Sequence, residues 1–186
     1  MESVVKRESP VTRKDLLKRI KETAYLEGDF VLRSGKRSKY YLDKYLFETC
    51  PDILKALGEE FAKYVTKDIT LIAGAELGGV ALAASAAMAT GKNWIIVRNS
   101  KKGYGTGKMI EGTLKPGDVV LLVEDIATTG GQVLEAAKVI TDAGAKVKKI
   151  VAVIDRKQGA QENITAAGYT FESILTKDDL GIKDID

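Results

Sequence analysis

Apolar residues gather in short runs that alternate with longer segments of helical periodicity. The clearest run covers residues 119–123, which are consecutive valines and leucines that follow a turn at residues 115–118. A run without polar alternation is typical of a strand buried on both faces of a parallel sheet. The same reasoning predicts further strands at residues 69–73, 94–97, 147–154 and 169–173.

Helical periodicity fills the intervals between these runs. Thr12 and Asp15 form a variant capping box for a helix at residues 12–25, and Pro51 begins a second helix with an apolar inner face. Further helices are predicted at residues 80–90, 132–143 and 160–167. This alternation predicts an α/β fold in three layers, with a mainly parallel five-stranded sheet and flanking helices.

The N-terminal part follows a different pattern. Residues 30–33 and 40–43 flank a turn-forming sequence, which predicts a hairpin or a bent pair of strands. We interpret this pair as a small hood on the core. We therefore expect a single domain over residues 1–186, divided into an N-terminal helix and hood at 1–50, an α/β core at 51–175 and a C-terminal tail at 176–186.

Composition restricts the function classes. Lys and Arg total 29 against 26 acidic residues, and the net charge of +3 gives no reason to expect nucleic acid or a membrane as a partner. The N-terminus has no secretory pattern and the longest apolar stretch is too short to span a bilayer, so we expect a cytoplasmic protein. The chain has no histidine and a single cysteine, Cys50, which excludes a disulfide within the chain, His-ligated zinc and triads that need histidine.

Two adjacent carboxylates, Glu124 and Asp125, follow the apolar run at 119–123, and a small, hydroxyl-rich loop at 127–131 leads into the next helix. Adjacent acids at a strand end are often a helix-capping feature. Here the loop offers backbone N–H groups for a phosphate at the carboxyl edge of the sheet. Two acids beside a phosphate would repel it, unless the ligand also presents hydroxyls or a cation. A ribose phosphate with Mg²⁺ meets this requirement.

Residues 101–108 contain three glycines and three lysines directly after a predicted strand. Their spacing matches neither the dinucleotide fingerprint nor a P-loop, because Met109 stands where a P-loop needs Ser or Thr. A solvated loop is the plainest interpretation. Its position at the carboxyl edge of the sheet favours a mobile, cationic lid.

Several segments resemble a known family. Residues 123–131, Val-Glu-Asp-Ile-Ala-Thr-Thr-Gly-Gly, resemble the motif for 5-phosphoribosyl-1-pyrophosphate (PRPP) in type I phosphoribosyltransferases. Residues 74–79 resemble the pyrophosphate loop of that family, and the predicted lid resembles its flexible catalytic loop. The orotate phosphoribosyltransferase family is indicated by three further segments: residues 30–41, the pair Val97-Arg98 with the lid, and residues 154–156.

The resemblance implies a role for each matching residue. Catalytic roles fall on Lys102, Asp125 and Glu124. Contacts with PRPP fall on Arg33, Arg98, Lys101, Lys102, Tyr104, Glu124, Asp125, Ile126, Ala127, Thr128, Thr129, Gly130, Gly131 and Gln132. The pyrophosphate loop would include Glu76, Leu77, Gly78 and Gly79, and orotate would meet Tyr40, Tyr41, Thr128 and Arg156. Arg156 suits orotate independently, because a guanidinium can bind its carboxylate in bidentate fashion.

The resemblance also implies a reaction and partners. The expected reaction transfers the phosphoribosyl group of PRPP to orotate, with Mg²⁺ held mainly by PRPP near Glu124 and Asp125. A homodimer is implied, in which the lid at 98–108 reaches the neighbouring active site. The lid departs from the family at Asn99, where a lysine is common, and at Tyr104, where a histidine is common.

Two alternatives remain at this stage. One is a phosphoribosyltransferase for another base, against which Arg156 and the Tyr40-Tyr41 pair argue. The other is a PRPP-sensing regulator that binds nucleic acid, which should carry a basic face or an added binding module. Neither feature is evident in a chain of net charge +3.

Overall fold

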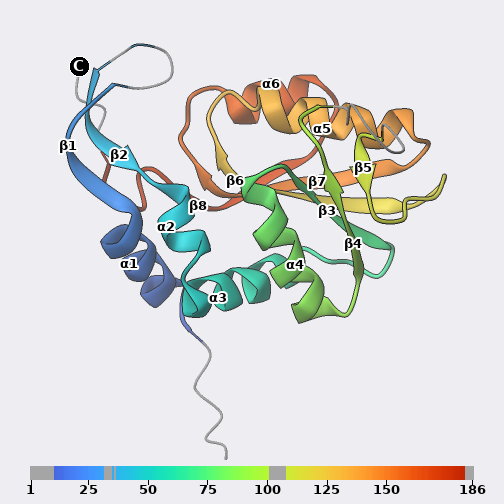
Figure 1. The fold of residues 1–186 in the computed structure, drawn as a ribbon, viewed down its shortest axis with the longest axis horizontal. Coiled ribbons are helices and arrows are strands. Elements are labelled where there is room, and N and C mark those ends of the chain that lie inside the picture. The colour runs from blue at the N-terminus through green and yellow to red at the C-terminus, as the bar shows by residue number, and fades with distance from the viewer. Residues whose placement is uncertain (1–10, 32–34, 36, 101–107, 183–186) are drawn as a thin grey trace, which may run out of the picture.

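The core of the protein is a twisted six-stranded sheet with the strand order β5-β4-β3-β6-β7-β8 (Figure 1). A computed structural model describes residues 11–31, 35, 37–100 and 108–182. Neighbouring strands are parallel except β4 and β5, which are antiparallel. The strands are β3 (Leu71–Ala75), β4 (Asn93–Val97), β5 (Ile110–Glu111), β6 (Val119–Ala127), β7 (Lys146–Asp155) and β8 (Phe171–Thr176).

The five predicted strands are confirmed, but some of their ends differ. β3 ends at Ala75 instead of residue 73, and β6 continues to Ala127 instead of ending at residue 123. The carboxylates at 124–125 therefore lie within a strand and not after it. β5 was not predicted, because two residues are too few to give a hydrophobic period; it is held by pairing with the end of β4.

Helices cover both faces of the sheet, which confirms the three-layer α/β fold (Figure 1). Alternate residues of β6 separate the two sides: Leu121 and Val123 pack with α3 and α4, whereas Val120 and Leu122 pack with α5 and α6. The predicted helices are confirmed with small shifts as α3 (Pro51–Ala62), α4 (Gly78–Thr90), α5 (Gly131–Asp142) and α6 (Ala160–Ala166).

The N-terminal segment places a helix and a hairpin beside this core. The predicted capping box is present in α1 (Arg13–Ala24), because the Thr12 hydroxyl accepts from the Asp15 N–H at 3.2 Å and the Asp15 carboxylate accepts from the Thr12 N–H at 3.3 Å. β1 (Tyr25–Val31) and β2 (Arg37–Leu42) form the predicted pair of strands, which is antiparallel. β1 begins at Tyr25 instead of residue 30, and β2 begins at Arg37 instead of residue 40. A short helix that was not predicted, α2 (Lys44–Glu48), then leads from the hairpin towards the core.

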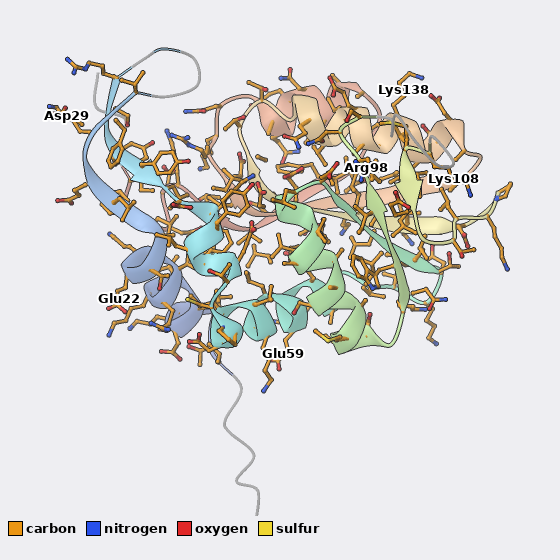
Figure 2. All side chains as sticks on the ribbon, viewed as in Figure 1. Glu22, Asp29, Glu59, Arg98, Lys108 and Lys138 are labelled. Atoms are coloured by element: carbon orange, nitrogen blue, oxygen red, sulfur yellow. The ribbon has the colours of Figure 1, made fainter. Side chains whose placement is uncertain are left out.

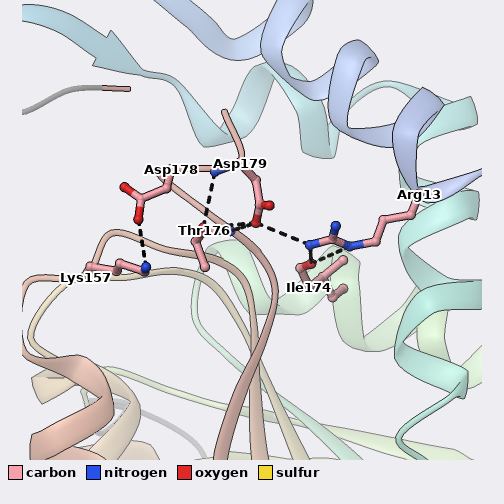
Figure 3. A network of polar contacts seen from close by, with 6 residues as sticks. All are labelled: Arg13, Lys157, Ile174, Thr176, Asp178 and Asp179. Carbon is pink, nitrogen blue, oxygen red and sulfur yellow. Dashed lines mark hydrogen bonds and ion pairs between the residues drawn. The ribbon is translucent and has the colours of Figure 1, made fainter. Parts of the chain in front are cut away.

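The chain after β8 is tied to α1 and to the end of β7 (Figure 3). The Arg13 guanidinium donates to the Ile174 carbonyl at 3.0 Å and pairs with Asp179 at 3.3 Å, and Lys157 pairs with Asp178 at 2.7 Å. Because Leu180 and Ile182 are buried in the same cluster as α1 and α3, this segment packs on the core.

Charged side chains cover the outer surface. Figure 2 shows Glu22, Glu59 and Lys138 pointing away from α1, α3 and α5, and all three are exposed. Among the described residues, no helix has the length and the apolar character that a membrane crossing requires.

Candidate active site

Two carboxylates lie buried in the last part of β6. Glu124 is 6% exposed and Asp125 is 3% exposed. One oxygen of Glu124, Oε1, accepts from the Asp125 N–H at 3.1 Å, whereas Oε2 has no hydrogen-bond partner among the described residues. A buried carboxylate oxygen without a partner is costly, so this atom is suited to accept a hydrogen bond from a ligand.

Asp125 has a partner on each carboxylate oxygen. Oδ1 accepts from the Ile126 N–H at 2.5 Å, and Oδ2 accepts from the Lys44 ammonium at 2.6 Å. Lys44 lies at the start of α2, and Glu48 at its end is 5% exposed with Oε1 unpartnered among the described residues. Three acids and one lysine therefore meet at the end of β6.

The electrostatics of this cluster follow from burial. Burial and then the charge of Asp125 raise the pKa of Glu48 to about 8, against the attraction of Lys44. The same two causes raise the pKa of Glu124 well above its usual range. Burial alone would lower the pKa of Lys44, but the charge and hydrogen bond of Asp125 outweigh it, and the pKa is raised. The lysine is therefore charged at neutral pH.

The loop after β6 has the form of an anion site. Thr128 and Thr129 lead to Gly130, which has the left-handed φ of 79° before α5 begins at Gly131. No side chain caps the N-terminus of α5, so its first N–H groups are available to a phosphate. The loop is supported from α6, where the Asn163 amide donates to the Thr129 carbonyl at 2.9 Å.

The loop after β3 packs directly against Asp125. It contains the residues to which we assign the pyrophosphate, Glu76, Leu77, Gly78 and Gly79, and α4 begins at Gly78 instead of the predicted residue 80. A Cβ atom at Gly78 would lie 1.6 Å from Asp125 Oδ2 and 3.0 Å from Glu48 Oε1. Glycine is therefore required there for this loop to approach Asp125 in β6 and Glu48 in α2.

Gln132 joins this loop to the beginning of the predicted lid. Its amide donates to the Glu76 carbonyl at 2.9 Å and to the Asn99 side-chain oxygen at 3.2 Å. The Asn99 N–H in turn donates to the Glu76 carboxylate at 3.2 Å, and the Arg98 guanidinium lies 3.8 Å from it. The backbone N–H of Arg98 donates to the Met109 carbonyl at 2.8 Å, so the two ends of the lid segment are neighbours. Figure 2 labels Arg98 and Lys108 in this part of the molecule.

The hood brings two tyrosines to the same edge. Tyr40 is buried, its ring stacks on Tyr25 with centroids 5.8 Å apart, and its hydroxyl accepts from the Arg156 guanidinium at 2.8 Å. The guanidinium carbon lies 5.6 Å from the Tyr40 ring centroid. Tyr41 is 42% exposed and lies against Phe30.

These groups surround a cavity of about 440 Å³ that is lined by Tyr41, Leu42, Lys44, residues 124–133 and Arg156. The site residues proposed from the sequence thus converge from β6, the following loop, the end of β7 and the hood. Tyr40 reaches this group through Arg156 and does not line the cavity itself. Four proposed residues, Arg33, Lys101, Lys102 and Tyr104, lie outside the described residues.

Lys44 and Glu48 were not identified from the sequence. The available signal was a pair of opposite charges four residues apart in the otherwise apolar segment after Asp43, whose carboxylate accepts from the Tyr45 N–H at 3.1 Å. That pattern also describes any solvated helix face. The partner of Lys44, Asp125, lies 81 residues away in the sequence, so no local sequence pattern indicates their contact.

A divalent cation would find few protein ligands here. Among the described residues, no three His, Cys, Asp or Glu side chains are arranged to hold a metal ion. Glu124 Oε2 and Glu48 Oε1 are the acidic oxygens of this cluster that have no hydrogen-bond partner in the described part of the chain. The site therefore suits an ion that brings most of its ligands with the substrate.

Comparison with known proteins agrees with this arrangement. The family model described as "Phosphoribosyl transferase domain" matches residues 48–183. An orotate phosphoribosyltransferase of Thermococcus gammatolerans is 45% identical over 166 residues, which cover 88% of each chain. Among solved structures, a Mycobacterium tuberculosis orotate phosphoribosyltransferase in complex with Fe(III) dicitrate has a TM-score of 0.83 at 31% identity and covers 91% of this chain and 99% of its own. Another structure of that enzyme, in complex with PRPP, has a TM-score of 0.79 at 29% identity with the same coverage. The chain therefore belongs to the orotate phosphoribosyltransferase family.

Proposed function

We propose that the site transfers the 5-phosphoribosyl group from PRPP to orotate, and releases orotidine 5'-monophosphate and pyrophosphate in pyrimidine biosynthesis. The observation that carries this proposal is the buried pair Glu124 and Asp125 directly before a phosphate-type loop. The relatives at 38–45% identity are orotate phosphoribosyltransferases, which supports orotate as the base.

The phosphate and the ribose are assigned to adjacent parts of the site. The N–H groups between Thr128 and Gln132 would hold the 5-phosphate at the N-terminus of α5. A ribose hydroxyl donated to Glu124 Oε2 would satisfy that buried oxygen. Ribose C1 would then lie between the two acids and the loop at residues 76–79, where the pyrophosphate would leave.

The chemistry follows from charge. Breaking the bond between ribose C1 and pyrophosphate leaves positive charge on the sugar and adds negative charge to the leaving group. Asp125 and Glu124 would stabilise the cationic ribose from buried positions, where their charges act more strongly than in water. Orotate is acidic at its ring nitrogen and can attack without a strong base, which is compatible with a chain that has no histidine.

We assign the base to the hood side. The Arg156 guanidinium would bind the orotate carboxylate, and its Nη2 is already oriented by the Tyr40 hydroxyl. Tyr41, which lines the cavity, and Thr128 would border the ring. The half-buried position of Arg156 favours an anionic base over hypoxanthine or uracil, which carry no carboxylate.

The leaving group needs cations that the described residues supply in part. Mg²⁺, when bound, would neutralise the pyrophosphate, with PRPP oxygens as its main ligands and Glu124 and Asp125 nearby. We assign further positive charge to Lys101 and Lys102 in the lid, hydrogen bonds to Tyr104, and contacts with PRPP to Arg33 and Arg98. We further propose a cytoplasmic homodimer in which the lid of one subunit reaches the other site.

The test is a turnover assay with PRPP and Mg²⁺ over a panel of bases, followed by ultraviolet absorbance. Consumption of orotate, with loss of turnover when EDTA removes Mg²⁺, is the expected result. Turnover of hypoxanthine or uracil in place of orotate would reject the assigned base. Sedimentation of the protein, and mixing of a Lys102→Ala variant with a variant inactive at Asp125, would test the shared lid. Recovery of activity in the mixture is expected if each lid serves the neighbouring site.

A further inference from the structure

The short helix α2 places a lysine beside the buried acids of the active site. The helix is fixed at both ends, because the Asp43 carboxylate accepts from the Tyr45 N–H and Phe47 is fully buried in the main apolar cluster. Lys44 therefore projects from a rigid position. Its side chain is 29% exposed, and its ammonium lies 5.2 Å from the Tyr45 ring centroid.

The Lys44–Asp125 pair differs from the other ion pairs between described residues. Its acid has a side chain that is 4% exposed, whereas the acids in the other pairs range from 13% to 63%. An exposed pair contributes little, because water and salt screen it. A buried carboxylate depends on its partner, because removal of that partner leaves a charge that neither water nor protein neutralises.

Two further acids lie beside the Lys44–Asp125 pair. Glu124 precedes Asp125 in β6, and Glu48 Oε1 and Asp125 Oδ2 both approach the backbone at Gly78. The Lys44 ammonium is the cation that the described residues place in hydrogen-bond contact with this acidic group. Its bond to Oδ2, together with the Ile126 N–H on Oδ1, fixes the plane of the Asp125 carboxylate.

We propose that Lys44 is a positioning residue for the phosphoribosyl transfer, acting through the ion pair that orients the Asp125 carboxylate beside the ribose. The inference rests on the proposed function, because it assigns Asp125 to the cationic sugar. The pair also lies against Gly78 of the loop assigned to the pyrophosphate, so a shift of Asp125 would disturb the cleavage site directly. The raised pKa of Lys44 is consistent with a permanent charge.

The test compares Lys44→Met, which keeps most of the length of the side chain but removes the charge, with Lys44→Arg, which retains the charge. We expect Lys44→Met to lower kcat by roughly 30-fold or more, with the KM for orotate changed less than about threefold. Lys44→Arg should recover kcat to within about fivefold of the wild type. The matched control is Lys148→Met, which breaks a pair of the same 2.6 Å length with Asp68, an acid whose side chain is 56% exposed. This control should leave both constants unchanged.

A double-mutant cycle shows whether Lys44 acts through Asp125. In the background Asp125→Asn, Lys44→Met should lower kcat by less than about twofold more, because the contact is already lost. Three results would each overturn the proposal. The losses in kcat could be additive in the cycle, or Lys44→Met could have the kcat of the wild type. The third result is a melting temperature that falls in both Lys44 variants while Lys44→Arg does not recover kcat. If the wild type uses a base other than orotate, the assignment of orotate as the substrate is rejected. The same variants are then assayed with the base that the wild type uses. Lys44 contacts the acid assigned to the ribose and not the group assigned to the base, so the two failures remain distinguishable.

Discussion

Removing one hydroxyl group, in Tyr40→Phe, tests how Arg156 is oriented for the base. The variant keeps the ring that stacks on Tyr25 at 5.8 Å and lies 5.6 Å from the guanidinium carbon, and it removes the 2.8 Å hydrogen bond. A hydrogen bond to a charged group contributes about 1.5–3 kcal/mol. Water can replace part of this because Arg156 is half-buried, so we expect a loss of about 1 kcal/mol, or about fivefold in kcat/KM for orotate.

The assay is steady-state turnover with orotate and PRPP varied in turn. The loss should appear in the KM for orotate, while the KM for PRPP stays within about twofold, because Arg156 is assigned to the base alone. Tyr25→Phe is the matched control, since it removes a hydroxyl from the partner ring and retains the stack. An unchanged KM for orotate in Tyr40→Phe would refute this account, as would an equal change for PRPP.

Three other predictions concern the acids, the pyrophosphate loop and the lid. Gly78→Ala should reduce kcat/KM for PRPP by about 100-fold or more, because the added Cβ would lie 1.6 Å from Asp125 Oδ2. The loss in kcat/KM for orotate should be smaller. Near-normal kinetics would show that the loop can move away from Asp125. Glu48→Gln should have a larger free energy of unfolding than the wild type at pH 9, by an amount on the order of a few kcal/mol. This difference should vanish near pH 4.5. The sign follows from a pKa that rises from 4.5 to about 8 on folding: the wild type loses stability as pH increases through this window, and denaturant titrations at both pH values measure it. Lys102→Ala should lower kcat by about two orders of magnitude through loss of a charge partner for the leaving group, and normal turnover would remove this lysine from the mechanism.

Hydrophobic periodicity predicted most of the fold because the core is built from long, regular patterns. The five parallel strands and the helices between them each bury a continuous apolar face, and that face is visible in the sequence. α2 and β5 were missed because five residues and two residues are too short to establish a period. Their positions are set by contacts with the core and with β4, which only the folded chain provides.

The site was predictable where adjacent residues act together. The loop after β6 and the loop at residues 76–79 are each contiguous, so composition and resemblance located them. Contacts between distant segments were not predictable in the same way. The Tyr40–Arg156 hydrogen bond joins residues 116 apart in the sequence, and the sequence alone assigned Tyr40 to the ring of the base and not to the guanidinium.

Glu124 and Asp125 stand at the predicted end of β6 but inside the observed strand, and this difference explains why they identify the active site. Two carboxylates after an apolar run indicate the end of a buried strand, because acids within a sheet core are normally unfavourable. In the structure the strand continues to Ala127, and the acids remain inside it. The burial that raises the pKa of Glu124 and disfavours its ionised form also strengthens its attraction to a cation in the same environment. Positive charge that develops on the ribose would therefore lower the pKa of Glu124, and both acids would stabilise that charge. A position that is unfavourable for the folded protein alone becomes favourable in the transition state, and this is the expected property of a preorganised site.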